Sequence, residues 1–98
     1  QVAESPYYVG LVHLQRGSVQ ASAGDRVSTG DQIGRCGNSG NSTQPHLHIQ
    51  AMDSPDPYAA KGVPLRFDEF QQHRPRQGPS WTLREQACPE QGSVIARL

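Results

Sequence analysis

The sequence predicts an all-β fold: an antiparallel β-sheet sandwich or barrel-like core with long loops. Three observations lead to this fold class. No stretch of about ten or more residues shows clean helical periodicity. Short apolar runs of Val, Ile, Leu and Tyr recur along the chain, as strands require. Ten glycines and eight prolines supply turn signals, and a spacing of about 8–12 residues between turns is typical of sandwiches and barrels.

Four segments in the first half are predicted strands, because each is a short apolar run bounded by turn residues. They are residues 7–14, 19–22, 32–37 and 46–52. Gly-Asp pairs between the second and third segments are turn chemistry, and Val27 and Ile33 are expected to point into the core. Residues 37–45 predict a long polar loop rich in Gly, Asn and Ser. The segment 46–52 is the strongest strand candidate.

Polar and Pro-containing segments dominate the second half, so fewer strands are expected there. Residues 53–62 predict a Pro-rich loop with at most one helical turn, and residues 63–70 return to extended structure. Residues 71–81 predict a polar surface loop in which Trp81 covers the sheet. A short closing strand is expected within residues 92–98.

Size and charge limit the classes of function. A chain of 98 residues is one small domain with a thin core. Nine basic and nine acidic residues cancel, so charge gives no argument for binding nucleic acid or an anionic membrane. No apolar run approaches the ~20 residues of a membrane-spanning helix. The chain enters a strand-like segment with no visible leader, and we expect a processed chain or a fragment.

Two cysteines leave the redox state open. Cys36 and Cys88 could form one disulfide, provided that the fold brings their Cα atoms within bonding range. Two unpaired thiols are an equally good interpretation of the sequence.

Histidines carry the candidate chemistry. In a strand, residues i and i+2 project from one face, so His46 and His48 are expected side by side. Leu47 and Ile49 would then turn into the core. Paired imidazoles suit metal binding and acid–base chemistry, yet such pairs recur by chance. The spacing alone favours polar residues on an exposed strand face, and the same holds for His13 at a predicted strand end.

Four motifs that follow one another along the chain favour a functional role for these histidines over a merely exposed position. They are "VHL" at 12–14, "GDRVSTGDQIG" at 24–34, "GNSGNST" at 37–43 and "PHLHI" at 45–49. Together they resemble the lysostaphin-type (LytM-like) zinc metallopeptidases of bacterial cell walls, over about residues 7–67. The segment 50–67 looks like the region after the active site in envelope-associated and actinobacterial-type members.

The resemblance implies a function and a role for each motif histidine. It implies a zinc endopeptidase that cleaves peptide cross-links of peptidoglycan in the bacterial cell envelope, outside the cell or in the periplasm. His48 matches the histidine that binds zinc. His46 and His13 match the two catalytic histidines, which position water and steady the oxyanion without binding the metal. Zinc itself polarises the water and the scissile carbonyl.

Two of the three zinc ligands expected from the resemblance have no counterpart here. They belong to a His-x-x-x-Asp segment upstream of the x-His-Leu segment, and none of the twelve residues before His13 is His or Asp. We therefore expect a sheet incomplete at its N-terminal side, an upstream part of the same domain, and no activity of this chain alone. His73, expected to be a solvated surface histidine, or Asp53 could substitute, but no spacing supports it.

The resemblance divides the chain into residues 1–70, the C-terminal part of a peptidase core, and residues 71–98, a loop-rich extension with a closing strand. One alternative is a degenerate domain that binds or regulates in the cell envelope. Another is an unrelated small β-domain, such as a carbohydrate- or phosphocarrier-like module. Lipoyl and biotin carriers contain similar Gly-Asp-x-Val stretches, but the only lysine, Lys61, lies in a Pro-rich loop and not at a hairpin tip.

Overall fold

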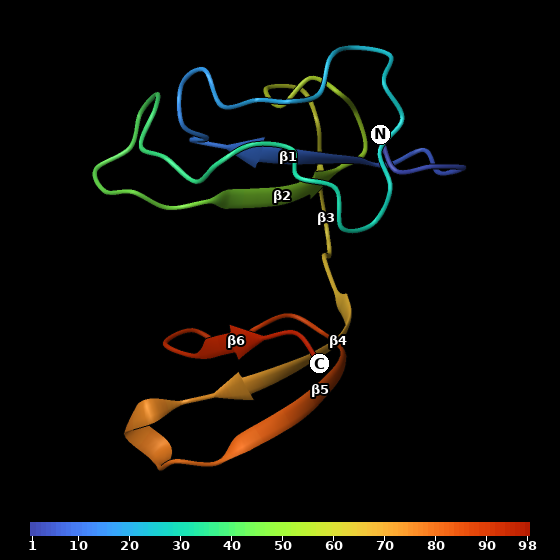
Figure 1. The fold of residues 1–98 in the computed structure, drawn as a ribbon. Coiled ribbons are helices and arrows are strands. Elements are labelled where there is room, and N and C mark those ends of the chain that lie inside the picture. The colour runs from blue at the N-terminus through green and yellow to red at the C-terminus, as the bar shows by residue number, and fades with distance from the viewer. The chain divides into compact units, whose positions relative to one another are not determined.

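The computed structural model describes residues 1–98, which form six strands, one short 3₁₀ turn and no α-helix (Figure 1). The elements are β1 (Tyr8–Val12), β2 (His48–Met52), β3 (Gly62–Val63), β4 (Phe67–His73), η1 (Pro75–Gln77), β5 (Trp81–Ala87) and β6 (Val94–Ala96). The all-β prediction is confirmed. The strands form two antiparallel sheets, and neither closes into a barrel. The sheets belong to two compact units, residues 1–63 and 64–98.

The first unit is built on a three-stranded sheet with the order β1-β2-β3. β1 and β2 pair antiparallel from Tyr8↔Met52 to Val12↔His48, which confirms the strands predicted within 7–14 and 46–52. The Pro-rich segment 53–62 is a loop, as predicted. It contains one hydrogen bond of helical type, from the Ala60 amide to the Asp56 carbonyl at 2.8 Å.

The sheet opens at one end, where a third segment enters between β1 and β2. Continuing the register would pair Leu14 with His46. Instead Leu14 bridges Cys36, and His46 bridges Gly37. The strand predicted at 32–37 is thus reduced to two isolated bridges, and the strand predicted at 19–22 is absent. Both segments lack a continuous partner strand, without which a short apolar run does not form a ladder.

The core of the first unit is thin and differs from the prediction. Met52 is its only buried hydrophobic side chain. Val27 is 56% exposed, Leu47 48% and Ile49 37%, so the prediction that these three side chains point into the core is wrong. Ile49 pairs with Leu11 of β1, and both lie on the sheet face opposite Met52 because side chains alternate along a strand.

The second unit contains a three-stranded sheet with the order β5-β4-β6. The loop predicted at 71–81 is wrong in part, since Gln71–His73 complete β4 and Trp81 begins β5. β5 itself was not predicted. Its sequence, WTLREQA, is largely polar and exposed, and its pairing with β4 at every residue but Gln86 makes it extended. The closing strand predicted within 92–98 is confirmed as β6.

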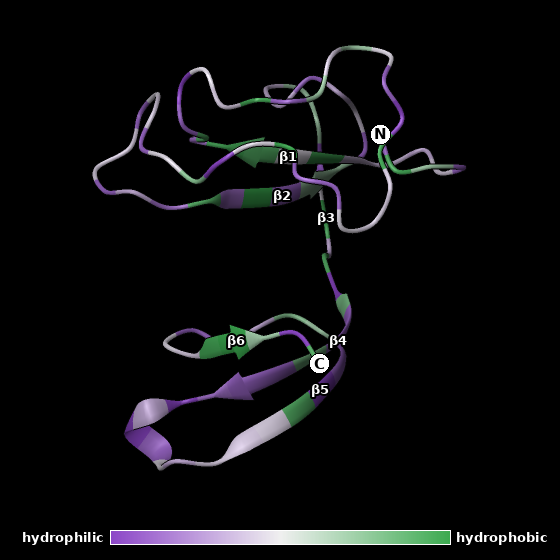
Figure 2. Ribbon diagram, in the orientation of Figure 1, coloured by the Kyte–Doolittle hydropathy of each residue, from purple (hydrophilic) through white to green (hydrophobic).

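One face of the second sheet is buried and the other is exposed. Phe70 and Gln72 of β4 are each 5% exposed. On the opposite face, Trp81 is 47% exposed and its ring lies 5.2 Å from that of His73. In Figure 2, β6 is coloured hydrophobic, whereas the end of β4 is hydrophilic. β4 therefore buries a polar side chain as well as an aromatic one.

Two remaining features concern the thiols and the membrane. Cys36 and Cys88 are free and exposed. None of the structure's helical segments has the length and apolar character that crossing a bilayer demands.

Candidate functional site

The first unit brings His13, His46 and His48 together. The His13 ring centroid lies 4.7 Å from that of His46 and 5.8 Å from that of His48. His48 begins β2, and its strand partner is Val12, the residue before His13. Antiparallel pairing therefore joins the histidines of the "VHL" and "PHLHI" motifs, which are more than thirty positions apart in the sequence.

The cluster lies where β1 and β2 separate. His13 has a φ of 68°, a left-handed conformation that few residues other than glycine adopt and that histidine tolerates better than most. The turn directs the chain from β1 toward the bridge between Leu14 and Cys36. The backbone amide of Gln15 completes this contact by donating to the Arg35 carbonyl at 2.8 Å.

Gly37 permits the entering segment to approach this closely. A Cβ atom at residue 37 would lie 2.5 Å from Gln15 Cα and 2.8 Å from the Leu14 carbonyl carbon, and closer still to the Gln15 amide nitrogen. These are backbone atoms that cannot rotate away. The Gly37 carbonyl also accepts a hydrogen bond from the His46 amide at 3.0 Å. This bond holds the backbone of His46 in place, two residues before β2 begins.

The polar loop after Gly37 orients the His13 ring. His13 Nδ1 lies 2.8 Å from the Ser39 carbonyl oxygen. Because a carbonyl only accepts, Nδ1 carries the proton and Nε2 is the free basic nitrogen of the neutral ring. The Ser39 hydroxyl in turn donates to the Leu14 carbonyl at 2.6 Å, which ties the loop to the end of β1.

The same loop orients the His46 ring in the same tautomer. His46 Nδ1 donates to the Gln44 carbonyl at 2.7 Å. The Ser42 hydroxyl lies 3.2 Å from this Nδ1 and 2.6 Å from Asn38 Oδ1. Two neighbouring imidazoles thus present unprotonated Nε2 atoms while backbone carbonyls hold their Nδ1 protons.

The sequence identified this loop as a motif but not its function as the support of two rings. The signal that could have identified it is its density of short polar side chains, because Ser and Asn bond readily to nearby backbone. His13 and His46 are half-buried and His48 is exposed. No hydrogen bond holds the His48 ring, so both of its nitrogens are available to solvent or a ligand.

The substitute ligands considered from the sequence are engaged elsewhere. Asp53 Oδ1 accepts from the Lys61 amide at 2.8 Å and closes the Pro-rich loop. His73 belongs to the second unit, where it is half-buried against Trp81 and its Nδ1 lies 3.3 Å from the Ser80 carbonyl. The prediction of a solvated surface histidine at 73 is right in part: the residue lies on the exposed face of the sheet, but β4 extends through it and pairs it with Trp81.

Imidazole nitrogens are suitable zinc ligands, and a carbonyl on the second nitrogen is the usual support of a ligand histidine. However, no group of three or more His, Cys, Asp or Glu side chains in the structure is arranged to hold a metal ion.

The fold and the site together define an all-β protein with a cluster of three histidines at the end of its first sheet. A comparison with known families gives the particular family: residues 2–60 match Peptidase family M23. The match covers more than half of the chain, and the chain belongs to this family. It confirms the resemblance to lysostaphin-type peptidases and implies a peptide as the class of substrate. A comparison with solved structures gave no match.

Proposed function

We propose that the chain is part of the catalytic domain of a zinc metalloendopeptidase that cleaves peptide cross-links of bacterial peptidoglycan, outside the cell or in the periplasm. The observation that carries the proposal is the cluster of His13, His46 and His48 in a chain of a peptidase family. His48 is assigned as the zinc ligand in this chain. His13 and His46 are assigned to catalysis.

The hydrogen bonds of the two catalytic histidines support this division of roles. Each ring holds its proton at Nδ1 against a backbone carbonyl, so each Nε2 can accept a proton from an attacking water. Once protonated, the same ring donates from Nε2 and can stabilise the oxyanion.

The other two zinc ligands are proposed to come from outside these 98 residues. A single histidine does not hold zinc tightly, since catalytic zinc sites use three protein ligands. The chain alone is therefore expected to bind little zinc and to be inactive. The alternative, a non-catalytic envelope module, is favoured by the absence of a three-ligand group, whereas the ordered catalytic pair favours the enzyme.

Zinc and cleavage are measured together to test the proposal. Zinc per chain is determined by elemental analysis after gel filtration, and new amino termini are counted after incubation with purified peptidoglycan. A longer protein that supplies an upstream His-x-x-x-Asp segment should bind about one zinc per chain and release amino termini. The 98-residue chain should do neither.

Three variants of the longer protein separate the roles. His48→Ala should lose both zinc and cleavage, whereas His13→Ala and His46→Ala should keep the zinc and lose cleavage. His73→Ala is the matched control and should keep both. Full cleavage by His13→Ala and His46→Ala would refute the assignment. Binding to peptidoglycan with zinc absent and no cleavage would establish the regulatory alternative.

A further inference from the structure

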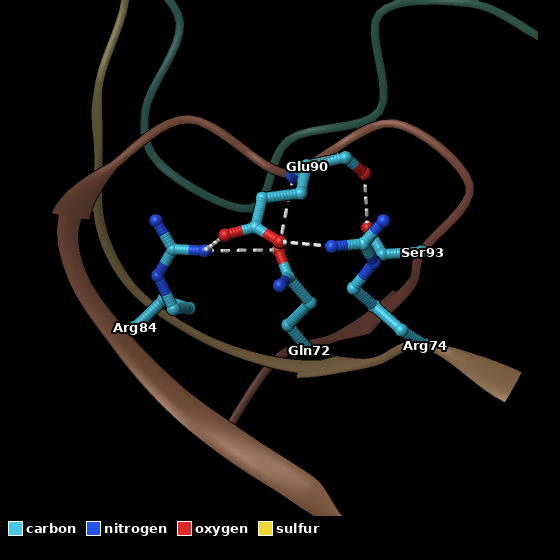
Figure 3. Close-up of polar contacts among 5 residues, drawn as sticks. All are labelled: Gln72, Arg74, Arg84, Glu90 and Ser93. Atoms are coloured by element: carbon cyan, nitrogen blue, oxygen red, sulfur yellow. Dashed lines mark hydrogen bonds and ion pairs between the residues drawn. The ribbon is translucent and has the colours of Figure 1, made fainter. Parts of the chain in front are cut away.

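The second unit contains a polar pocket that the proposed function does not use. Its volume is about 330 Å³, which is within the range of sites for small molecules. Gln72 of β4 and Thr82 of β5 line it as direct cross-strand partners. Arg74, Arg84 and Glu90 line it as well (Figure 3). We call it the Gln72 pocket.

An ion cluster forms one side of the Gln72 pocket. The Glu90 carboxylate accepts from Arg74 Nη1 at 2.9 Å through one oxygen and from Arg84 Nη1 at 2.9 Å through the other. Two guanidinium groups and one carboxylate leave one positive charge. Each guanidinium has five N–H donors, so most of these donors remain available beside the pocket. The cluster shows that both guanidinium groups reach a carboxylate here, each through a single Nη1, and the remaining N–H groups of each guanidinium fork suit a second carboxylate.

Gln72 adds a buried donor whose orientation is determined. Its Oε1 accepts from the Glu90 amide at 3.0 Å and from Arg84 Nη1 at 3.3 Å. Two donors at this atom exclude the flipped amide, in which a nitrogen would face them. The Gln72 NH₂ group must therefore point away from the cluster, as Figure 3 shows.

The NH₂ group of Gln72 has no partner in the chain. Gln72 is only 5% exposed, and no side-chain nitrogen or oxygen that is sealed from solvent lacks a partner. The nitrogen is therefore open to solvent, and Gln72 lines the pocket. A donor that would otherwise face solvent gains from a ligand that supplies a stronger acceptor.

The chemistry of the pocket selects an anion. Donors predominate among its free groups: the Gln72 NH₂ and the remaining guanidinium N–H groups only donate, whereas Gln77 and the hydroxyls of Ser80 and Thr82 both donate and accept. Both oxygens of Glu90 are already engaged. We propose that the Gln72 pocket binds a small molecule or peptide end that carries a single carboxylate. A net charge of one suits a monoanion better than a doubly charged phosphate.

The test is an NMR titration of the 98-residue chain with N-acetylglycine. The neutral N-acetylglycinamide, of nearly the same shape, is the control ligand, and inorganic phosphate is a third probe. N-acetylglycine should shift the Gln72 side-chain amide signals saturably, with a Kd of about 1–10 mM. N-acetylglycinamide should bind at least about tenfold more weakly, since it lacks the charge-assisted hydrogen bonds.

A matched pair of variants localises the binding. Gln72→Glu keeps an acceptor for the Glu90 amide but places a negative oxygen in the pocket, so affinity should fall at least about tenfold. Gln71→Glu makes the same chemical change on the opposite face of β4 and should bind as the wild type does. Equal binding of the neutral ligand, unmoved Gln72 signals, or saturation by phosphate alone would each overturn the proposal.

Discussion

Replacement of Gly37 by alanine tests how the histidine cluster is built. The three atoms nearest to the added Cβ would be backbone atoms of Leu14 and Gln15, all within 2.8 Å. The entering segment would have to move away. Overpacking of this kind costs about 1–3 kcal/mol.

Displacement of the segment around Gly37 would also weaken two hydrogen bonds. His46 N–H donates to the Gly37 carbonyl at 3.0 Å, and Gln15 N–H to the Arg35 carbonyl at 2.8 Å. At about 0.5–1.5 kcal/mol each, their weakening brings the expected loss of unfolding free energy to about 3 kcal/mol. With an m-value of about 1.5 kcal/mol/M, the urea midpoint should fall by about 2 M.

Gly62→Ala is the matched control, because a Cβ at residue 62 of β3 meets nothing within 4 Å. This variant should keep the wild-type midpoint or exceed it slightly. Urea unfolding is followed by NMR signals of the first unit, together with the ring signals of His13 and His46. An unchanged midpoint and unchanged ring signals in Gly37→Ala would refute the account of the close approach.

Three further predictions concern the two units. Ser42→Ala should lower the stability of the first unit by about 1 kcal/mol but leave the His46 proton on Nδ1, because the Gln44 carbonyl is the closer partner; ¹⁵N chemical shifts of the ring would check this. In thermal melts, Glu90→Gln should lower the free energy of unfolding by at most about 1 kcal/mol, since its ion pairs are partly exposed. Gln72→Leu should lower it by about 1–3 kcal/mol, because the variant leaves the Glu90 amide unpaired. The 98-residue chain should melt below about 60 °C or self-associate, because few hydrophobic side chains are buried; a sharp, reversible, concentration-independent melt above that temperature would contradict the expectation.

The fold was predictable where local sequence and long-range pairing agree. Residues 7–14 form a short run of Tyr, Val and Leu, residues 46–49 alternate His with Leu and Ile, and each segment finds an antiparallel partner in the other. Residues 19–22 and 32–37 have a similar local pattern but no continuous partner. β5 shows the reverse case, because its polar sequence carries little strand signal and its extended form depends on pairing with β4.

The sequence by itself determined the all-β class, the family and the three histidines of the candidate site. These depend on short-range periodicity, turn residues and ordered motifs, which are all readable along the chain. Only the tertiary structure decided that His13 lies beside His46 and His48, which side chains stay exposed, and that Gly37 opens the sheet. These features arise from strand register and from backbone contacts between distant segments. These features depend on the pairing energies between distant segments, which cannot be read from the local sequence pattern.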